Sequence, residues 1–178
     1  QGITAIGYES LLVAGASQSY FNTAVGSLTG RALTSGMRNT FIGHEAGKAQ
    51  TTASYNTFIG AKCGLANTTG QYNTAIGQEA LTTCTTGYNN EAFGYYALKK
   101  LTTGFWNVAI GNEGLLECTT GHTNVAIGQE SGKLITTGYE NVVIGYKAGD
   151  NLTTGENNII IGYNADASSA TATHEITL

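Results

Sequence analysis

A 17-residue repeat runs along almost the whole chain, and a chain with this period is restricted to stacked copies of one small unit. In ten places a triplet such as TAI or VAI is followed by a glycine, and after a slightly longer first interval these glycines recur at every 17th position. The glycines of this first series are Gly7, Gly26, Gly43, Gly60, Gly77, Gly94, Gly111, Gly128, Gly145 and Gly162. Asparagine stands four positions before the glycine in nine of the ten copies, from Asn22 to Asn158.

A second glycine series follows a Thr-Thr pair in most copies. Its members are Gly36, Gly70, Gly87, Gly104, Gly121, Gly138 and Gly155, and Ala53 fills the one vacancy. The consensus unit is therefore N-x-(A/F/V)-(I/V)-G-x-x-small-(L/G)-x-x-x-T-T-G-x-x. This unit is too short for a helical-hairpin repeat, which needs more than about 30 residues, and its pattern differs from that of a leucine-rich repeat.

The length of the unit suits one coil of a parallel β-solenoid with two short strands and two corners. The triplet before the first glycine is expected to form one strand, and the Thr-Thr pair is expected to lie at the centre of the other. Glycine supplies corner dihedrals that residues with a Cβ resist. The absence of proline agrees with a stack in which nearly every backbone N–H pairs with the next coil. We predict an all-β parallel β-solenoid (β-roll) of ten coils over residues 1–165, and a C-terminal segment, 166–178, that leads out of the repeats.

The hydrophobic pattern assigns the two faces of the first strand. The residue directly before each first-series glycine is Ile, Val or Phe in all ten copies, from Ile6 to Ile161, and we expect this column to face inward. A second inward column is expected at Leu33, Cys84, Leu101, Cys118, Ile135 and Leu152. The residue two before the glycine points the opposite way and is also apolar, most often Ala.

A strand that is apolar on both faces is covered on both faces, and a single coil of this length cannot enclose two cores. We therefore expect the column of small residues to contact other copies of the chain in a closed homo-oligomer. The Asn column is expected to form a stacked amide ladder, and the Thr-Thr pairs are expected to form a similar ladder at the other corner.

Composition excludes several classes of function. The net charge is −4 with eight scattered Lys and Arg, so no footprint for nucleic acid is visible, and no apolar run is long enough for membrane insertion. Cys84 and Cys118 occupy one repeat position two coils apart, or roughly 10 Å, which is beyond the ~7 Å limit for a disulfide. We expect all three cysteines to be free thiols, which favours assembly in a reducing cytoplasm. Because the chain begins with Gln, we expect it to be part of a longer protein.

The unit NTAIGxxALxxxTTGxxN resembles the repeat of bacteriophage tail-fibre and tailspike proteins, over residues 20–165. It is similar in pattern to the NSVAIG repeat in the heads of trimeric autotransporter adhesins, which are trimers of left-handed β-rolls. The ending SSATATHEITL is similar to the tail-fibre segment that leads into a chaperone removed after trimerisation. The resemblance implies a homotrimeric fibre domain that meets a polysaccharide or other receptor on the host surface.

Three locations and roles remain open for such a domain. It is expected in a virion tail fibre assembled in the host cytoplasm, and free cysteines favour this location because adhesins cross an oxidising periplasm. The alternatives are the head of a trimeric adhesin on a bacterial cell surface and a purely structural fibre spacer.

Recognition is expected at the positions that vary between repeats. Most of the tyrosines and the one tryptophan lie at the corners, and aromatic rings stack on the apolar faces of sugars. The residues expected to edge a carbohydrate-binding groove are Tyr72, Tyr88, Phe105, Trp106 and Tyr139. The alternative is that these rings pack across an interface between chains.

Catalysis, metal binding and ice binding are not expected. Glu113 and Glu130 lie on adjacent coils, about 5 Å apart, a spacing reminiscent of retaining glycosidases, but a solvated polar corner explains them. The three histidines, His44, His122 and His174, have no partners at metal-ligand spacing, so neither a metal nor another cofactor is predicted. An ice-binding face needs columns of Thr side by side on one face. The two Thr of each pair in this chain are consecutive, so in a strand they would point to opposite faces and only one column would face outward.

Overall fold

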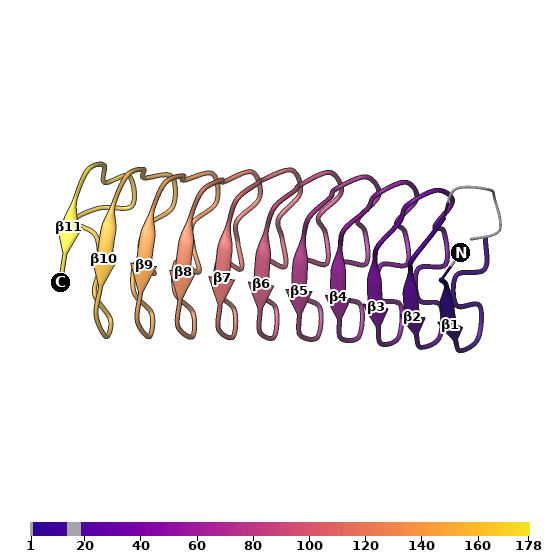
Figure 1. Cartoon of the computed structure of the whole chain (residues 1–178). Helices are drawn as coiled ribbons and strands as arrows, with labels where there is room; N and C mark the ends of the chain where they lie inside the picture. The colour runs from indigo at the N-terminus through magenta and orange to yellow at the C-terminus, as the bar shows by residue number, and fades with distance from the viewer. Residues whose placement is uncertain (1, 14–18) are drawn as a thin grey trace.

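The strands of the solenoid lie side by side in chain order, with the two termini at opposite ends of the stack (Figure 1). The structure, a computed structural model, describes residues 2–13 and 19–178. The described residues form one 11-stranded parallel sheet. Its strands are β1 (Thr4–Ile6), β2 (Thr23–Val25), β3 (Thr40–Ile42), β4 (Thr57–Ile59), β5 (Thr74–Ile76), β6 (Glu91–Phe93), β7 (Val108–Ile110), β8 (Val125–Ile127), β9 (Val142–Ile144), β10 (Ile159–Ile161) and β11 (Ile176–Thr177). The predicted parallel β-solenoid, with about ten coils that each correspond to one sequence repeat, is confirmed.

The register of the sheet follows the sequence repeat. In β4 and β5, for example, Phe58 pairs with Ala75 and Ile59 pairs with Ile76, so each residue lies beside its counterpart in the next repeat. Equivalent positions of the repeat therefore lie directly above one another, and each variable position becomes a column that runs along the solenoid.

Each coil contributes one strand to the sheet, and the prediction of a second strand at the Thr-Thr pair is wrong. The chain there is bent, although it remains hydrogen-bonded to the next coil: the amide of Thr85 donates to the carbonyl of Thr102 at 2.9 Å. Two positions after each second-series glycine the backbone enters the left-handed region, as at Tyr72 with φ 59°. These bends keep the segment from becoming an extended strand.

The two faces of the strands are reversed relative to the prediction. The middle residue of every strand from β2 to β10 is completely buried, as Ala75 is, whereas Ile76 after it is 38% exposed. The column of Ile, Val and Phe from Ile6 to Ile161 thus faces outward, and the column of small residues, which was expected to contact other chains, lies in the core.

Volume inside the coil explains this reversal. Leu81 and Cys84, on the opposite wall of the same coil as Ala75, are completely buried and fill the interior. In β4 the middle residue is Phe58 instead of Ala, and Gly64 stands where Leu81 stands in the next coil. The narrow interior therefore has room for one large side chain at this level. Three consecutive coils have alanine in the strand where a buried leucine enters from the other side, in the pairs Ala75 and Leu81, Ala92 and Leu98, and Ala109 and Leu115. The second predicted inward column is confirmed, because all six of its members are buried.

The two glycine series serve different geometries. Gly77 has φ 141°, and a Cβ on it would collide with the carbonyl oxygen of Gly94. Gly87, of the second series, has no positive φ, but a Cβ there would lie 2.5 Å from the carbonyl oxygen of Gly104. Our expectation of special dihedrals thus holds for the first series, whereas the second series is glycine because adjacent coils approach closely.

Buried polar ladders join the coils. The side chain of Asn107 donates to Asn90 Oδ1 at 3.1 Å and to the carbonyl of Gly121 at 2.9 Å, and its own Oδ1 accepts from the backbone amide of Asn124. Its equivalents from Asn22 to Asn158 are buried in the same ladder, which confirms the prediction. At the other corner the Thr85 hydroxyl donates to the carbonyl of Thr102, one coil further along.

The stack continues beyond residue 165. Strand β11 pairs in parallel with β10, and the amide of Glu175 donates to Asn158 Oδ1 at 3.0 Å, as the next asparagine of the ladder would. Ala172 takes the place of the second-series glycine, and its carbonyl accepts from Asn158 Nδ2.

All three cysteines are free and buried, as expected. Burial raises the pKa of each thiol to about 12. The thiols therefore stay protonated at neutral pH and act as small apolar fillers.

Candidate functional site

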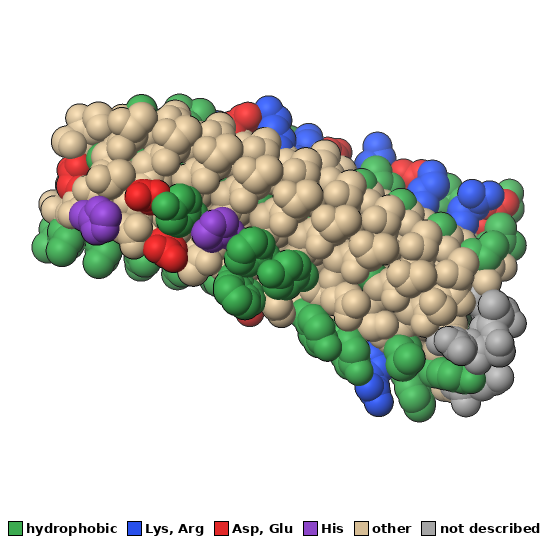
Figure 2. Space-filling model, turned by 90° about the horizontal axis from the view of Figure 1, so that it is seen from above, with side chains coloured by type: hydrophobic (Ala, Val, Ile, Leu, Met, Phe, Trp, Pro, Cys, Tyr) green, Lys and Arg blue, Asp and Glu red, His purple; other side chains and the backbone are tan. Residues whose placement is uncertain are grey.

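One long edge of the solenoid carries the variable corner that follows the second-series glycine. Each coil presents there a pair of residues directly before the buried Asn, and we call this the aromatic edge. Its ring-bearing members are Tyr20, Phe21, Tyr55, Tyr72, Tyr88, Phe105, Trp106, His122 and Tyr139. Figure 2 shows hydrophobic, His and acidic side chains in a row along this edge.

The first residues of the pairs form one stack of rings. Tyr88 and Phe105 have centroids 5.1 Å apart, Phe105 and His122 4.7 Å, and His122 and Tyr139 4.9 Å. The planes of these neighbours are within 21° of parallel. Glu156 is the first residue of the pair in the next coil. Its hydrogen bond with the Tyr139 hydroxyl raises the pKa of Tyr139. We call this column lane one.

The second residues of the pairs form lane two at the N-terminal half of the edge. The Arg38 guanidinium lies 5.8 Å from the ring centroid of Phe21 and 5.4 Å from that of Tyr55. It also donates to the Tyr55 hydroxyl at 2.6 Å. Tyr55 then stacks on Tyr72 with a centroid separation of 4.9 Å. Lane two therefore combines cation–π and aromatic stacking over four coils.

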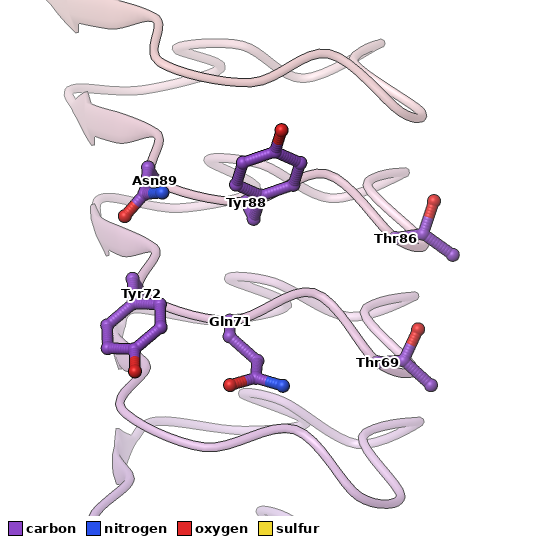
Figure 3. Close-up of a pocket in the computed structure, with 6 residues that line it drawn as sticks. All are labelled: Thr69, Gln71, Tyr72, Thr86, Tyr88 and Asn89. Atoms are coloured by element: carbon purple, nitrogen blue, oxygen red, sulfur yellow. The ribbon is translucent and has the colours of Figure 1, made fainter.

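The two lanes meet at an open pocket of about 320 Å³. Tyr72 is the last ring of lane two, and Tyr88, one coil further along, is the first ring of lane one. The pocket between them is lined by Thr69, Gln71, Tyr72, Thr86, Tyr88 and Asn89. Figure 3 shows the Tyr72 and Tyr88 rings extending away from each other, so that the space between the two coils stays open.

Trp106 is the most prominent ring at the centre of the edge. It is 56% exposed and stands nearly perpendicular to lane one, with interplanar angles of 77° to Tyr88 and 82° to Phe105. Its backbone φ is 55°, in the left-handed region that every described second residue of the pairs adopts from Phe21 onward. This backbone turn, which is costly for a bulky residue, brings the indole ring to the surface beside the stack.

The structure thus brings together four of the five residues predicted from the sequence. Tyr88, Phe105 and Tyr139 lie in lane one, and Trp106 packs beside it. Tyr72 lies in lane two and reaches this group only across the pocket. Sequence reasoning missed His122, which links Phe105 to Tyr139, and the polar pocket residues Thr69, Gln71, Thr86 and Asn89. The 17-residue period could have identified these residues, because residues at the same repeat position lie beside one another on adjacent coils and each of these residues has a predicted ring as a neighbour.

The acidic column lies on a different corner and is occupied by ion pairs. Lys133 Nζ lies 2.6 Å from a carboxylate oxygen of Glu113 and 3.2 Å from one of Glu130, and Lys147 is 3.8 Å from Glu130. The hydrogen bond from Lys133 lowers the pKa of Glu130. A carboxyl group whose pKa is lowered in this way is unsuited to act as a general acid at neutral pH.

The part of the chain that the structure describes has neither a cluster of metal ligands nor a membrane-spanning helix. In residues 2–13 and 19–178, no three His, Cys, Asp or Glu side chains are grouped closely enough to hold a metal ion. The same part of the chain contains no helix that could span a membrane.

Comparisons with protein-family models, with curated proteins and with solved structures find no match to this chain. Its class therefore rests on the register of the sheet and the period of the repeat, and it is a parallel β-solenoid repeat protein.

Proposed function

We propose that this chain is a rigid segment of a viral tail fibre that binds carbohydrate on a host surface through the aromatic edge. The observation that carries the proposal is the exposed row of rings in two lanes, with Trp106 and Tyr72 more than half exposed. Large exposed aromatic side chains that are held in place by their neighbours are suited to binding, because they lose little entropy when a ligand covers them.

Sugars fit this edge chemically. The C–H faces of a pyranose ring stack on aromatic faces, and its hydroxyl groups hydrogen-bond to amides and hydroxyls such as those of Gln71 and Thr86. The edge runs parallel to the stacking direction of the coils, so a polysaccharide lying along it would meet one pair of variable residues per coil. The proposed activity is binding without catalysis.

The outward face of the sheet supports a homo-oligomer. In strands β1 to β10 the first and third residues point outward, and among them only Glu91 is charged. Ile110 and Ile127, for example, are 40% and 37% exposed. We propose that other copies of this chain cover this face, because only a partner with the same spacing between coils can interdigitate with a periodic apolar column along its whole length.

Three copies are proposed from the resemblance of the repeat to tail-fibre proteins. A trimer would present three identical aromatic edges, so that weak sugar sites gain avidity on a surface that carries many copies of one glycan. The proposed location is the virion, after assembly in the host cytoplasm, where buried reduced thiols are stable. The alternative functions are an adhesin head on a bacterial cell surface and a structural spacer that binds no ligand.

A glycan array probed with the purified protein tests the proposal. We expect binding to a host-surface polysaccharide, and we expect Trp106→Asn to lose it while the oligomer stays intact. Asparagine is the suitable replacement because Asn89 and Asn157 adopt the same left-handed conformation at the equivalent position. Tyr163→Ala is the matched control, because Tyr163 is 77% exposed but belongs to another corner.

The outcomes separate the candidate roles. Binding that survives Trp106→Asn contradicts the role of the aromatic edge. Dissociation of the oligomer by the same substitution would place the rings in an interface between chains. Absence of binding to every host polysaccharide favours the spacer. Release of reducing ends from a bound polysaccharide would overturn the proposal of binding without catalysis.

A further inference from the structure

The pocket between Tyr72 and Tyr88 exists because the ring column changes lanes between two adjacent coils. Within the described residues Tyr72 has a ring partner only on the side of Tyr55, and Tyr88 only on the side of Phe105 and Trp106. The position that would continue lane one beneath Tyr88 is occupied by Gln71. Two aromatic side chains therefore border one open space, and each has a side that no other ring covers.

The polar groups around this space are available to a ligand. The side chains of Thr69, Gln71 and Thr86 make no hydrogen bond to other described residues, and all three are exposed. Together with Asn89 they offer two hydroxyls and two amides, which both donate and accept. A sugar ring needs this combination, since its hydroxyl groups also donate and accept.

The charge of the pocket restricts the ligand further. The six lining residues are threonines, tyrosines, a glutamine and an asparagine, so the lining contains no Asp, Glu, Lys, Arg or His. The nearest acidic residue along the chain is Glu91, two positions after Asn89 and exposed, and the net charge of the chain is −4. No lining cation would offset the desolvation of a carboxylate or sulfate group, and the net negative charge of the chain also disfavours an anion.

The size of the pocket sets the length of what it holds. A volume of about 320 Å³ lies at the lower end of the range for small-molecule pockets. We infer that this pocket holds a single uncharged sugar residue of the host glycan, bound between Tyr72 and Tyr88. This inference rests on the proposed function, and it names the part of the aromatic edge that selects the ligand.

Saturation-transfer-difference NMR on the intact protein tests the inference with defined probes. The neutral probes are lactose, maltotriose and N,N′-diacetylchitobiose, and the anionic probes are sialyllactose and digalacturonic acid. We expect transfer to at least one neutral probe and at least tenfold weaker binding of the anionic ones. Tyr88→Gln, which copies the residue of the preceding coil, should weaken binding of the neutral probe by about tenfold.

A second variant fills the pocket without removing a ring. Gln71→Tyr would extend lane one by one ring beneath Tyr88 and occupy the space, so binding should be lost while thermal stability is kept. Asn112→Tyr is its control, because it adds a ring at an exposed position of another corner, where Tyr95 and Tyr146 stand in other coils, and it should leave binding unchanged.

The results distinguish this inference from the proposed function. Preference for an anionic probe, or unchanged binding by Gln71→Tyr when Trp106→Asn abolishes it, would overturn the neutral pocket but leave recognition by the aromatic edge standing. Binding of none of the probes, together with no binding to host cells, would overturn both.

Discussion

Gly64 lies directly against the ring of Phe58: a Cβ at Gly64 would be 2.5 Å from the Cδ2 atom of that ring. In the next coil the equivalent pair is Leu81 and Ala75, both completely buried. Gly64 and Leu81 share nearly the same backbone conformation, with φ values of 58° and 54°. The two pairs are thus alternative ways of filling the same cross-section.

This relationship predicts a compensating double substitution. Phe58→Ala should destabilise the protein by about 3–5 kcal/mol because it leaves a cavity, and Gly64→Leu alone should destabilise it by overpacking. The double variant should recover most of the loss, because it recreates the packing of the next coil. Denaturant unfolding of the four proteins measures the coupling, and additive losses would contradict the shared cross-section.

The amide ladder predicts a large effect from a small polar change. Asn107→Ala removes the acceptor of the Asn124 amide and the donor to the Gly121 carbonyl, which leaves buried polar groups without partners. We expect a loss of about 2–4 kcal/mol, since each unsatisfied buried group costs about 1–3 kcal/mol. Asn112→Ala, at an exposed position, is the control and should have almost no effect. Equal unfolding midpoints for the two variants would count against a structural ladder.

The buried thiols predict resistance to alkylation. Burial raises the pKa of Cys63, Cys84 and Cys118 to about 12, so little thiolate forms at pH 8 and the reagent has no access. Iodoacetamide should modify none of the three in the folded protein and all three in guanidinium chloride, as mass spectrometry can determine. Rapid modification of the folded protein would mean that the core opens.

The ion pairs of the acidic column predict a modest dependence of stability on pH. The hydrogen bonds from Lys99 and Lys133 lower the pKa of Glu79 and Glu130 below its unfolded value. Their contribution is complete above the unfolded pKa of about 4.3 and is lost as the pH falls through the folded pKa. Thermal melting temperature should therefore decline below about pH 4. The decline should shrink in 1 M salt, because these side chains are partly exposed and salt screens their charges. A melting temperature that is constant from pH 7 to pH 3 would contradict these pairs.

The repeat period was sufficient to predict the fold class, the position of each three-residue strand and the Asn ladder. These features depend only on which residues lie above one another, and a 17-residue period determines that directly. The resemblance to fibre repeats pointed to the same class of fold.

The faces of the strand were not predictable from hydrophobicity. Both Ala75 and Ile76 are apolar, and choosing the larger residue as the core residue ignored the leucine that enters from the opposite wall. The informative signal was a paired change between adjacent coils. A large residue and a glycine, Phe58 and Gly64, are replaced in the next coil by a small residue and a leucine, Ala75 and Leu81. Such a compensating change in side-chain size indicates that the two positions pack against each other in the core. The pocket was missed because it depends on where the rings change lanes, not on any single residue.

The outward apolar column predicts that a charge on it separates the chains. Ile110→Glu places a carboxylate in the middle of the exposed face, where Ile110 is 40% exposed in a single chain. Because the side chain lies on the outward face of the sheet, the circular dichroism spectrum should stay unchanged while the molecule dissociates. Thr120→Glu, at an exposed position outside the strands, is the control and should keep the assembly intact. If Thr120→Glu dissociates and Ile110→Glu does not, the chains contact one another through a face other than the outward Ile column.

The mass of the purified protein in solution tests the central claim most directly, namely that copies of this chain cover the outward Ile face. Sedimentation equilibrium at micromolar concentration should give three times the chain mass of 18.5 kDa. A stable, well-folded monomer of 18.5 kDa in dilute buffer would contradict the account.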